Sequence, residues 1–353
     1  MSNKTVGIVG GGQLGRMLAM AAARLGFHTI ILEPQDKCPA SQVAGSQITA
    51  AYDDSDALQT LAVLSDVITY EFENVPVAAA RKLAEKTPVF PPPEALEISQ
   101  DRLSEKTFLR ECGIGTADFF AVDSQLEVDE ALAKLGGSGV LKTRRLGYDG
   151  KGQRVFKDPG AGTARAYDDL GGVPLIMESL VPFVAEISVI AARSPAGDIV
   201  SYDPARNVHS DGILRRSNVP AGLNGDTLDA ARSSAATLLE RLDYVGVVGV
   251  EFFVLDDGAV LANEFAPRVH NSGHWTEAAC AVSQFEQHVR AICGLPLAAC
   301  DRHSDCEMEN LIGDDINRLD AFLEQPDTVV HVYGKAETRP GRKMGHVTRL
   351  IRP

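Results

Sequence analysis

The chain has 353 residues, of which 44% are hydrophobic and 23% charged, and its formal net charge is −14. This length exceeds what one hydrophobic core usually organises, so we expect two or three domains. An acidic chain lacks the broad basic face that general nucleic-acid binding requires, which excludes nucleic acid as a partner. A phosphate-bearing ligand must therefore meet a local basic pocket.

The amino-terminal segment MSNKTVGIVGGGQLG contains a short apolar run that glycines interrupt, without a small-residue cleavage site. This pattern predicts a first β-strand rather than a signal peptide. No apolar stretch is long enough to span a bilayer, so we expect no membrane partner. The six cysteines form no CxxC pair, which favours reduced structural thiols in the cytoplasm over a zinc site.

The first hundred residues alternate predicted strands and helices. The strand VGIVG precedes a helix from Leu14 to Leu25, and the strands HTIIL and DVITYEF continue the rhythm. Such βαβ units indicate a parallel sheet covered by helices. We therefore predict a Rossmann-like α/β domain over residues 1–100.

A proline cluster at Pro91–Pro93 marks the first boundary, and the helical segment DRLSEKTFLREC opens the next unit. Short strands around a glycine-rich loop predict a small lid domain over residues 101–182. The strands EISVIAA, VGVVGVEFFVL and AVLANEFA follow, and then one long helix from about Ser272 to Cys293. These elements predict a larger α+β domain over residues 183–353.

The segment from Gly10 to Gly15 fits GxGxxG directly after the first predicted strand. Such a turn aims backbone N–H groups and a helix N-terminus at an anion. Glu33 ends the second strand, where dinucleotide-binding folds place a ribose-binding acid, so an NAD-dependent enzyme is an alternative. The same glycines also serve close packing of helix and sheet, so this motif alone does not decide the function.

Lys142 lies in an apolar predicted strand, directly before the glycine-rich loop Gly147–Gln153. The backbone amides of such a loop can close over a polyphosphate while a lysine meets it as a point charge. A solvated hairpin is the plain alternative. We favour phosphate binding, because a buried ammonium group needs an anionic partner.

The segment from Glu251 to Glu264 predicts a β-hairpin that turns at Asp257-Gly258. A two-residue turn sets Glu251 directly opposite Glu264, with their Cβ atoms roughly 4.5–5.5 Å apart. Like charges in this arrangement destabilise a hairpin unless a cation offsets them, and oxygen ligands near a polyphosphate favour Mg²⁺. If the turn takes three residues instead, Asn263 faces Glu251 and the two carboxylates become diagonal neighbours.

The segment from Glu264 to Trp275 leads from this hairpin into the predicted last helix. Arg268, His270 and the free N–H groups of that helix would converge on an anion. A zinc site made by His270 and His274 is an alternative, but it lacks a third ligand nearby.

A second basic segment follows near the carboxyl end, where five cations crowd a twelve-residue span around Pro340-Gly341. This turn joins the predicted strands TVVHVY and HVTRL. In an acidic chain, such a focused basic loop is predicted to meet a phosphate or carboxylate rather than to form a solvated face.

Eight strings occur in the order known from one family: GGGQLGRM, YEFENVP, QDRLSEK, LKTRRLGYDGKGQ, NVHSDGILRRS, GVEFFV, NEFAPRVHNSGHW and RPGRKMGH. Over nearly its whole length the chain thus resembles the N5-carboxyaminoimidazole ribonucleotide synthetases, which are ATP-grasp ligases. The resemblance implies a homodimer, in which each subunit has three domains and holds the nucleotide between the second and third. It also implies that ATP and bicarbonate carboxylate 5-aminoimidazole ribonucleotide through carboxyphosphate, with release of ADP and phosphate, in de novo purine biosynthesis.

The resemblance also implies site residues. Those that would contact ATP are Arg102, Lys142, Gly147, Tyr148, Asp149, Gly150, Lys151, Gly152, Gln153, Glu178, Ser179, Leu180, Val181, Glu186, His209, Asn263 and Glu264. Those that would hold Mg²⁺ are Glu251 and Glu264. Those that would surround bicarbonate and the ribonucleotide are Tyr148, Asp149, Arg268, His270, Asn271, Ser272, Lys335, Arg342 and Lys343, with Gln13 and the first glycine loop at its phosphate. Asp149 is the candidate acceptor of the amine proton, and Arg268, His270, Lys335, Arg342 and Lys343 are the other candidate catalytic residues.

Two further classes remain as alternatives. Another ATP-grasp ligase, such as a formate-using glycinamide ribonucleotide transformylase or a biotin carboxylase relative, would share Lys142 and the glutamate pair but differ around NSGHW and RPGRK. A non-catalytic or NAD-binding module built on the GxGxxG sheet would bind nicotinamide and hydrolyse no ATP.

Overall fold

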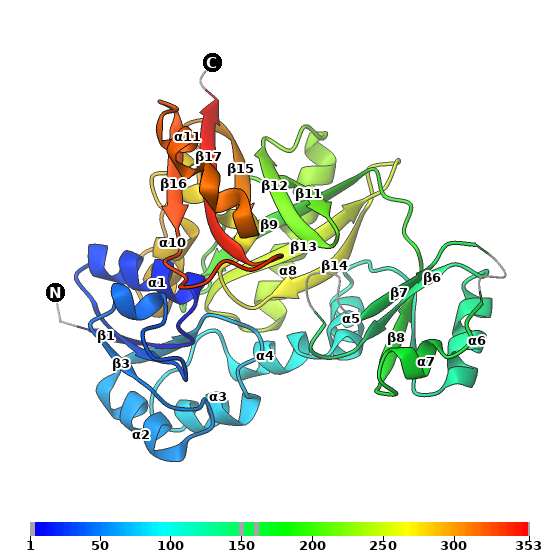
Figure 1. The fold of residues 1–353 in the computed structure, drawn as a ribbon, viewed down its shortest axis with the longest axis horizontal. Helices are drawn as coiled ribbons and strands as arrows, with labels where there is room; N and C mark the ends of the chain where they lie inside the picture. The colour runs from blue at the N-terminus through cyan, green and yellow to red at the C-terminus, as the bar shows by residue number, and fades with distance from the viewer. Residues whose placement is uncertain (1–3, 148–151, 159–161, 352–353) are drawn as a thin grey trace.

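The computed structural model describes residues 4–147, 152–158 and 162–351 (Figure 1). Its amino-terminal sheet is parallel, in the order β3-β2-β1-β4. The strands are β1 (Thr5–Val9), β2 (His28–Leu32), β3 (Ser46–Ile48) and β4 (Val67–Tyr70), and the helices are α1 (Gln13–Arg24), α2 (Ser55–Leu64) and α3 (Val77–Ala84). The expected parallel α/β arrangement is confirmed, and the predicted first helix differs from α1 by one residue at each end.

Two helices, α4 (Pro93–Ser99) and α5 (Arg102–Glu111), lead to a small antiparallel sheet in the order β5-β8-β6-β7. The Asp101 side chain caps α5 by accepting from the backbone N–H groups of Leu103 and Ser104. The elements of this unit are β5 (Phe119–Val122), α6 (Gln125–Lys134), β6 (Gly139–Thr143), β7 (Gln153–Phe156), α7 (Ala166–Asp169) and β8 (Leu175–Glu178). This small sheet lies at the far right of Figure 1, away from the amino-terminal sheet.

The largest sheet has nine strands among the described residues, in the order β14-β13-β9-β11-β12-β15-β17-β16, with β10 paired to β9. All of its pairings are antiparallel. The strands are β9 (Ala185–Arg193), β10 (Ile199–Ser201), β11 (Ala205–Ser210), β12 (Ile213–Val219), β13 (Gly246–Val254), β14 (Val260–Ala266), β15 (Asp305–Ile312), β16 (Thr328–Val332) and β17 (Lys343–Ile351). The helix α8 (Gly225–Arg241) packs against it, as expected for an α+β unit.

The predicted single helix from Ser272 to Cys293 is wrong. The segment forms three pieces: η2 (Asn271–Gly273), α9 (Thr276–Ala279) and α10 (Gln284–Ile292). Cys280 adopts an extended conformation, and the Ser283 side chain caps α10 by accepting from the N–H of Glu286. The apolar residues keep a helical spacing on both sides of this break, because α9 and α10 bury their apolar faces in the same core. The spacing alone therefore did not reveal the break.

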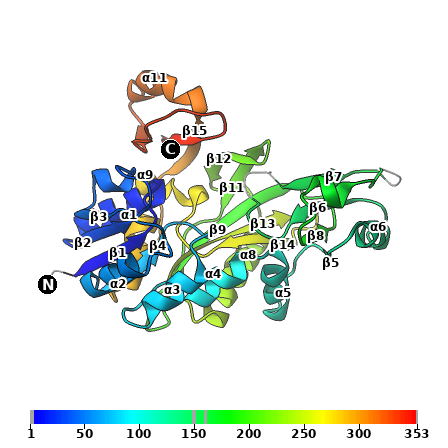
Figure 2. The same cartoon turned by 60° about the horizontal axis from the view of Figure 1, so that its bottom comes forward.

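That core joins the amino-terminal sheet to the largest sheet. Met17 and Leu18 of α1 belong to one buried cluster with Phe285 and Val289 of α10 and with Trp275. The two views agree that α1 lies beside the elements that cover the large sheet (Figures 1 and 2). Within the described ranges, no helix combines the length and apolar character needed to cross a lipid bilayer.

Candidate active site

A cavity of about 480 Å³ opens between the small sheet and the large sheet, with the start of α1 at one end. Concave sites of this size, with convergent polar groups, are where small ligands bind. It is lined by eighteen residues that the sequence predicted: Gln13, Arg102, Lys142, Gly147, Gln153, Glu178, Ser179, Leu180, Val181, Glu186, His209, Glu251, Asn263, Glu264, Arg268, His270, Asn271 and Lys343. Residues far apart in the sequence thus meet around one space.

Eight further predicted site residues are not among the described residues that line this cavity. Tyr148, Asp149, Gly150 and Lys151 are outside the described residues. Gly152, Ser272, Lys335 and Arg342 are described, but they are not among the residues that line this cavity.

The first glycine loop is occupied from within the protein. The carboxyl group of Glu71 accepts from the N–H of Gly12 (2.5 Å) and of Gly15 (2.8 Å), and Glu33 accepts from the N–H of Gly11 (2.9 Å). Glu33 also accepts from the Tyr52 hydroxyl (2.6 Å). Gly10 has φ +105°, a conformation that glycine adopts without strain. The anion that this turn binds is therefore an internal carboxyl group, which removes the basis for a dinucleotide site there.

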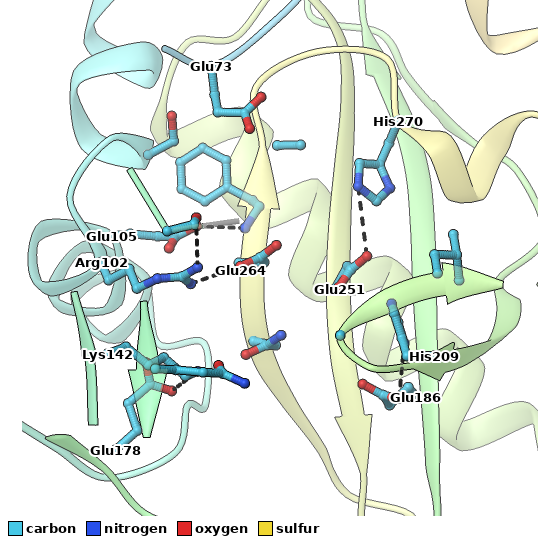
Figure 3. Close-up of a pocket in the computed structure, with 18 of the residues that line it drawn as sticks. Glu73, Arg102, Glu105, Lys142, Glu178, Glu186, His209, Glu251, Glu264 and His270 are labelled. Atoms are coloured by element: carbon cyan, nitrogen blue, oxygen red, sulfur yellow. Dashed lines mark hydrogen bonds and ion pairs between the residues drawn. The ribbon is translucent and has the colours of Figure 1, made fainter. Parts of the chain in front are cut away.

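Lys142 of β6 points into the cavity and pairs with Glu178 of β8 (Figure 3), with 3.1 Å between Nζ and Oε2. Lys106 of α5 reaches the same oxygen at 3.2 Å and is itself fully buried. Desolvation opposes ionisation of Glu178, but the two lysines outweigh it and hold its pKa below the ordinary value. Desolvation is also the main cause that lowers the pKa of Lys142. The buried ammonium group expected at Lys142 thus has an internal carboxylate partner.

The hairpin between β13 and β14 combines the two registers that the sequence left open. Leu255 and Ala259 close a three-residue loop, in which Gly258 has φ +86°, so the predicted two-residue turn is wrong. A β-bulge next to Glu251 then shifts the register by one residue, and Glu251 pairs directly with Glu264. The two carboxylates are therefore opposite one another, as predicted, but a three-residue loop and a bulge produce this pairing instead of a two-residue turn.

Helix α5 supports this bulge with two charged side chains. Lys106 Nζ donates to the carbonyl oxygen of Asn263, the extra residue of the bulge, at 2.9 Å. Glu105 accepts from the N–H of Phe265 at 2.7 Å. Both α5 side chains are buried, so they fix the strand that carries Glu264.

The two facing glutamates (Figure 3) differ in the direction in which their surroundings shift the pKa. Desolvation and the nearby Glu264 carboxylate raise the pKa of Glu251 above its ordinary value. Desolvation also acts on Glu264, but the Arg102 guanidinium, whose Nη1 lies 2.9 Å from Glu264 Oε2, outweighs it and holds that pKa below its ordinary value. The pair therefore carries a charge repulsion that the protein offsets only in part.

His270 stands next to Glu251, with 3.7 Å between His270 Nε2 and Glu251 Oε1. Desolvation, followed by the Arg268 charge, lowers its pKa to about 3, so the ring is neutral at physiological pH. Arg268 pairs with Glu73 at 2.6 Å, and both residues line the cavity. A neutral hydrogen-bonding ring and a guanidinium group thus flank one end of the cavity.

The basic loop near the carboxyl end contacts the amino-terminal unit. Lys335 Nζ lies 2.5 Å from Gln13 Oε1 and 2.6 Å from the carbonyl oxygen of Lys343. Arg342 donates to the carbonyl oxygen of Glu337 at 3.0 Å. Lys343 is the loop cation that lines the cavity, and Lys335 stands behind it. His346, from the same basic span, is instead fully buried.

Three family models match successive segments of the chain. They describe a ribonucleotide synthetase preATP-grasp domain (residues 3–100), an ATP-grasp domain (107–285) and a phosphoribosylaminoimidazole carboxylase C-terminal domain (306–352). The N5-carboxyaminoimidazole ribonucleotide synthase of Brucella melitensis is 62% identical over 347 residues, which are 98% of this chain and 96% of that protein. The chain belongs to the N5-carboxyaminoimidazole ribonucleotide synthase family.

Solved structures of this synthase family have the same fold. An ADP complex of N5-carboxyaminoimidazole ribonucleotide synthetase matches with a TM-score of 0.96 and 40% identity, over 99% of this chain and 93% of that one. The Aspergillus clavatus synthase, in complex with ADP and 5-aminoimidazole ribonucleotide, matches with a TM-score of 0.93 and 31% identity, over 99% and 94% of the two chains. The ATP-grasp fold expected from the sequence is confirmed.

The donor set of this synthase-family chain fits a magnesium ion. Among the described residues, no group of three or more His, Cys, Asp or Glu side chains could hold a metal by itself. Mg²⁺ typically takes one or two protein carboxylates and completes its shell with substrate phosphates and water. The facing oxygens of Glu251 and Glu264, on a cavity that also contains Lys142, match this requirement.

Sequence reasoning missed several residues of the synthase cleft. Glu73 and Glu105 line the cavity, and Lys106 lies directly behind Glu178. Desolvation and the Glu264 carboxylate raise the pKa of Glu105 to about 8. Arg102, Glu105 and Lys106 have the i, i+3, i+4 spacing of one helix face, and this signal could have predicted that a charged face of α5 meets the site.

The opposite end of the cavity is apolar. Phe183 and Phe253 stack with ring centroids 4.8 Å apart and planes inclined by 15°. Val155, Leu180 and Phe183 line this end and are more exposed than the core residues. Leu180 and Phe183 follow β8 and Val155 lies in β7, and together they form an apolar surface that suits a flat heteroaromatic group. No pattern in the sequence indicated the stacked pair.

Proposed function

We propose that this chain is an ADP-forming carbon–nitrogen ligase. It uses ATP and bicarbonate to carboxylate the amine of 5-aminoimidazole ribonucleotide, and it releases N5-carboxyaminoimidazole ribonucleotide, ADP and phosphate in de novo purine biosynthesis. The observation that carries this proposal is one cavity with two chemically distinct ends, in a chain of the synthase family. Lys142 lies on the small sheet at one end and His270 at the other, and the facing glutamates lie between them (Figure 3), with Glu251 next to His270. Arg268 and Lys343 also line this cavity.

The first step joins bicarbonate to the γ-phosphoryl group of ATP. A bicarbonate oxygen forms a bond to phosphorus, the bond to the β-phosphate oxygen breaks, and ADP leaves carboxyphosphate behind. Lys142 would bind the phosphates as a point charge, and the apolar end near Phe183 would hold the adenine. A magnesium ion held by Glu251 and Glu264 would neutralise charge on the phosphates.

The second step transfers the carboxyl group. The ribonucleotide amine attacks the carboxyl carbon, the carbon–oxygen bond to phosphate breaks, and the amine loses a proton. Arg268, Lys343 and the neutral His270 would donate hydrogen bonds to the oxygens that gain charge. Asp149, which lies outside the described residues, remains the predicted acceptor of the amine proton. An Asp149→Asn variant with normal turnover would remove it from this role.

Further features belong to the same proposal. We infer three structural units over residues 1–100, 101–182 and 183–353, because each contains one of the three sheets. We also propose Mg²⁺ as the metal, a homodimer as the assembly and the cytoplasm as the location. Six free cysteines suit a reducing compartment.

The test is ADP release from Mg²⁺-ATP, with bicarbonate and ribonucleotide added separately and together. We expect rapid ADP release only with both, together with an acid-labile carboxylated product. ADP release that requires formate and glycinamide ribonucleotide instead would overturn the assigned substrate. No ADP release with any of these substrates would overturn the ligase assignment.

A further inference from the structure

Gln284 makes an unusual set of contacts behind the cavity. It lies in the first turn of α10 and is fully buried. Its Oε1 accepts from the N–H of His270 at 2.9 Å, and its Nε2 donates to the carbonyl oxygen of His270 at 2.7 Å. The side-chain amide thus pairs with both polar backbone groups of one residue of the site.

The orientation of this amide is unambiguous. The backbone N–H of His270 can only donate and its carbonyl can only accept, so Oε1 and Nε2 cannot be exchanged. The second hydrogen on Nε2 points toward His274 Nδ1, at 3.2 Å. A Cβ at Gly273 would lie only 2.7 Å from Gln284 Oε1, so the amide fits because residue 273 has no side chain.

The His270 ring is fixed from two further sides. A Cβ at Gly249 would lie 2.5 Å from His270 Cβ, so the side chain packs directly on the backbone of β13. The backbone N–H of Ser272 donates to His270 Nδ1 at 3.4 Å. The same Nδ1 also lies 2.8 Å from the Ser272 hydroxyl, which can donate or accept. A backbone N–H can only donate, so the neutral ring that satisfies both contacts has no hydrogen on Nδ1 and carries it on Nε2, the atom that faces Glu251 in the cavity.

We propose that Gln284 is a positioning residue for carboxyl transfer: it holds the His270 backbone so that the ring directs its Nε2–H into the cavity. This inference rests on the proposed role of His270 in the reaction. Neither Gln284 nor its other partner His274 lines the cavity, so its effect on the reaction would pass through His270. Hydrogen-bond partners behind metal ligands typically change activity about 10–100-fold when they are removed, and we expect an effect of the same order behind His270.

The same helix offers a matched control. Gln287 is also fully buried, its Oε1 accepts from the N–H of Ala298 at 3.0 Å, and its Nε2 donates to the carbonyl oxygen of Ala298 at 2.7 Å. This second amide clamp has the same chemistry and burial as the first. Neither Gln287 nor Ala298 lines the cavity.

The experiment compares Gln284→Met with Gln287→Met in the full chain. Methionine keeps the length of the side chain and removes both hydrogen bonds, so both variants should lose stability. We expect kcat for ribonucleotide-dependent ADP release to fall about 10–100-fold in Gln284→Met, with the KM for ATP within about twofold of wild type. Gln287→Met should keep kcat within about twofold. Equal kcat in the two variants would overturn the inference.

A double-variant cycle separates this inference from the role of His270. If Gln284 acts through His270, adding Gln284→Met to His270→Asn should slow turnover by less than about twofold. A full additional 10–100-fold loss in the double variant would overturn the inference. Normal turnover in His270→Asn would instead overturn the proposed role of His270. If Gln284→Met does not fold, Gln284→Asn against Gln287→Asn gives the same comparison, because the shorter amide cannot reach both backbone groups.

Discussion

Two parts of the molecule place glutamates beside a glycine-containing turn, and they differ in how the carboxyl groups are satisfied. Glu71 follows β4 and accepts two backbone N–H groups from the first glycine loop. Glu251 and Glu264 face each other across β13 and β14, where Arg102 pairs with Glu264 and the His270 ring lies 3.7 Å from Glu251. Burial raises the pKa of Glu71. Burial and the facing Glu264 carboxylate together raise the pKa of Glu251.

The difference shows where ligand binding is expected in this fold. The first glycine loop has the stronger sequence motif, but its N–H donors are already used inside the protein. The hairpin has no motif beyond a turn, yet it leaves a charge repulsion for a bound cation to relieve. The uncompensated charge of the Glu251/Glu264 pair is therefore a better indicator of a ligand-binding site than the GxGxxG motif.

The largest expected effect is at the hairpin. Glu264→Gln should lower kcat by at least about 100-fold, because the proposed metal at the phosphates would supply several kcal/mol of transition-state stabilisation. The variant should also need more Mg²⁺ for half-maximal rate. Initial rates over a magnesium titration measure both effects. Glu307→Gln, in the same sheet but outside the cavity, is the control and should keep wild-type rates.

A smaller effect concerns His288, which joins the amino-terminal sheet to β13. Its Nδ1 accepts from the N–H of Val247 (3.0 Å), and its Nε2 lies 2.9 Å from Thr69 Oγ1. Desolvation lowers its pKa to about 3, so below pH 6.5 the unfolded chain binds a proton that the folded chain does not. Stability should therefore fall as the pH drops from 6.5 toward 3.

His288→Asn should remove this part of the pH dependence. Each pH unit below 6.5 is worth up to about 1.4 kcal/mol, so the loss between pH 7 and pH 5 should shrink by roughly 2 kcal/mol in the variant. Urea unfolding at the two pH values measures it. If the free energy of unfolding changes between the two pH values as much in the variant as in wild type, His288 is not a buried neutral side chain.

The smallest effect is at the first glycine loop. Glu71→Gln keeps one acceptor oxygen but turns an amide N–H₂ toward the second backbone donor, which should cost roughly 1–2 kcal/mol in the free energy of unfolding. The ATP and Mg²⁺ dependences of the rate should stay at wild-type values. A large rise in the Mg²⁺ concentration needed for half-maximal rate would contradict the claim that the hairpin binds the metal while the Glu71 carboxyl group only stabilises the first glycine loop.

Much of this arrangement could be predicted from the sequence, since it depends on local patterns. The parallel sheet and the helix after the first glycine loop follow from apolar spacing. The pairing of Glu251 with Glu264 is predicted from a two-residue turn, whereas the structure reaches it with a three-residue loop and a β-bulge. The bulge at Asn263 could not be predicted in this way. It is stabilised by Lys106, a residue 157 positions away in the sequence.

Two other features also depend on distant contacts. The predicted helix from Ser272 to Cys293 is interrupted where Cys280 bridges to Arg302, and apolar spacing contains no information about that partner. The use of the first glycine loop by Glu71 depends on β4 lying beside β1. The motif marks an anion-binding turn, but tertiary contacts decide which anion occupies it.

The most direct test of the central claim follows an oxygen isotope from bicarbonate. If a bicarbonate oxygen attacks the γ-phosphorus and the carbon–oxygen bond later breaks, then ¹⁸O-labelled bicarbonate should deliver one ¹⁸O to each phosphate released with the carboxylated ribonucleotide. Mass spectrometry of the phosphate measures this transfer. Phosphate with one bicarbonate-derived oxygen is the predicted result. Phosphate whose new oxygen comes from water, formed at the same rate, would contradict phosphorylation of bicarbonate in this cavity.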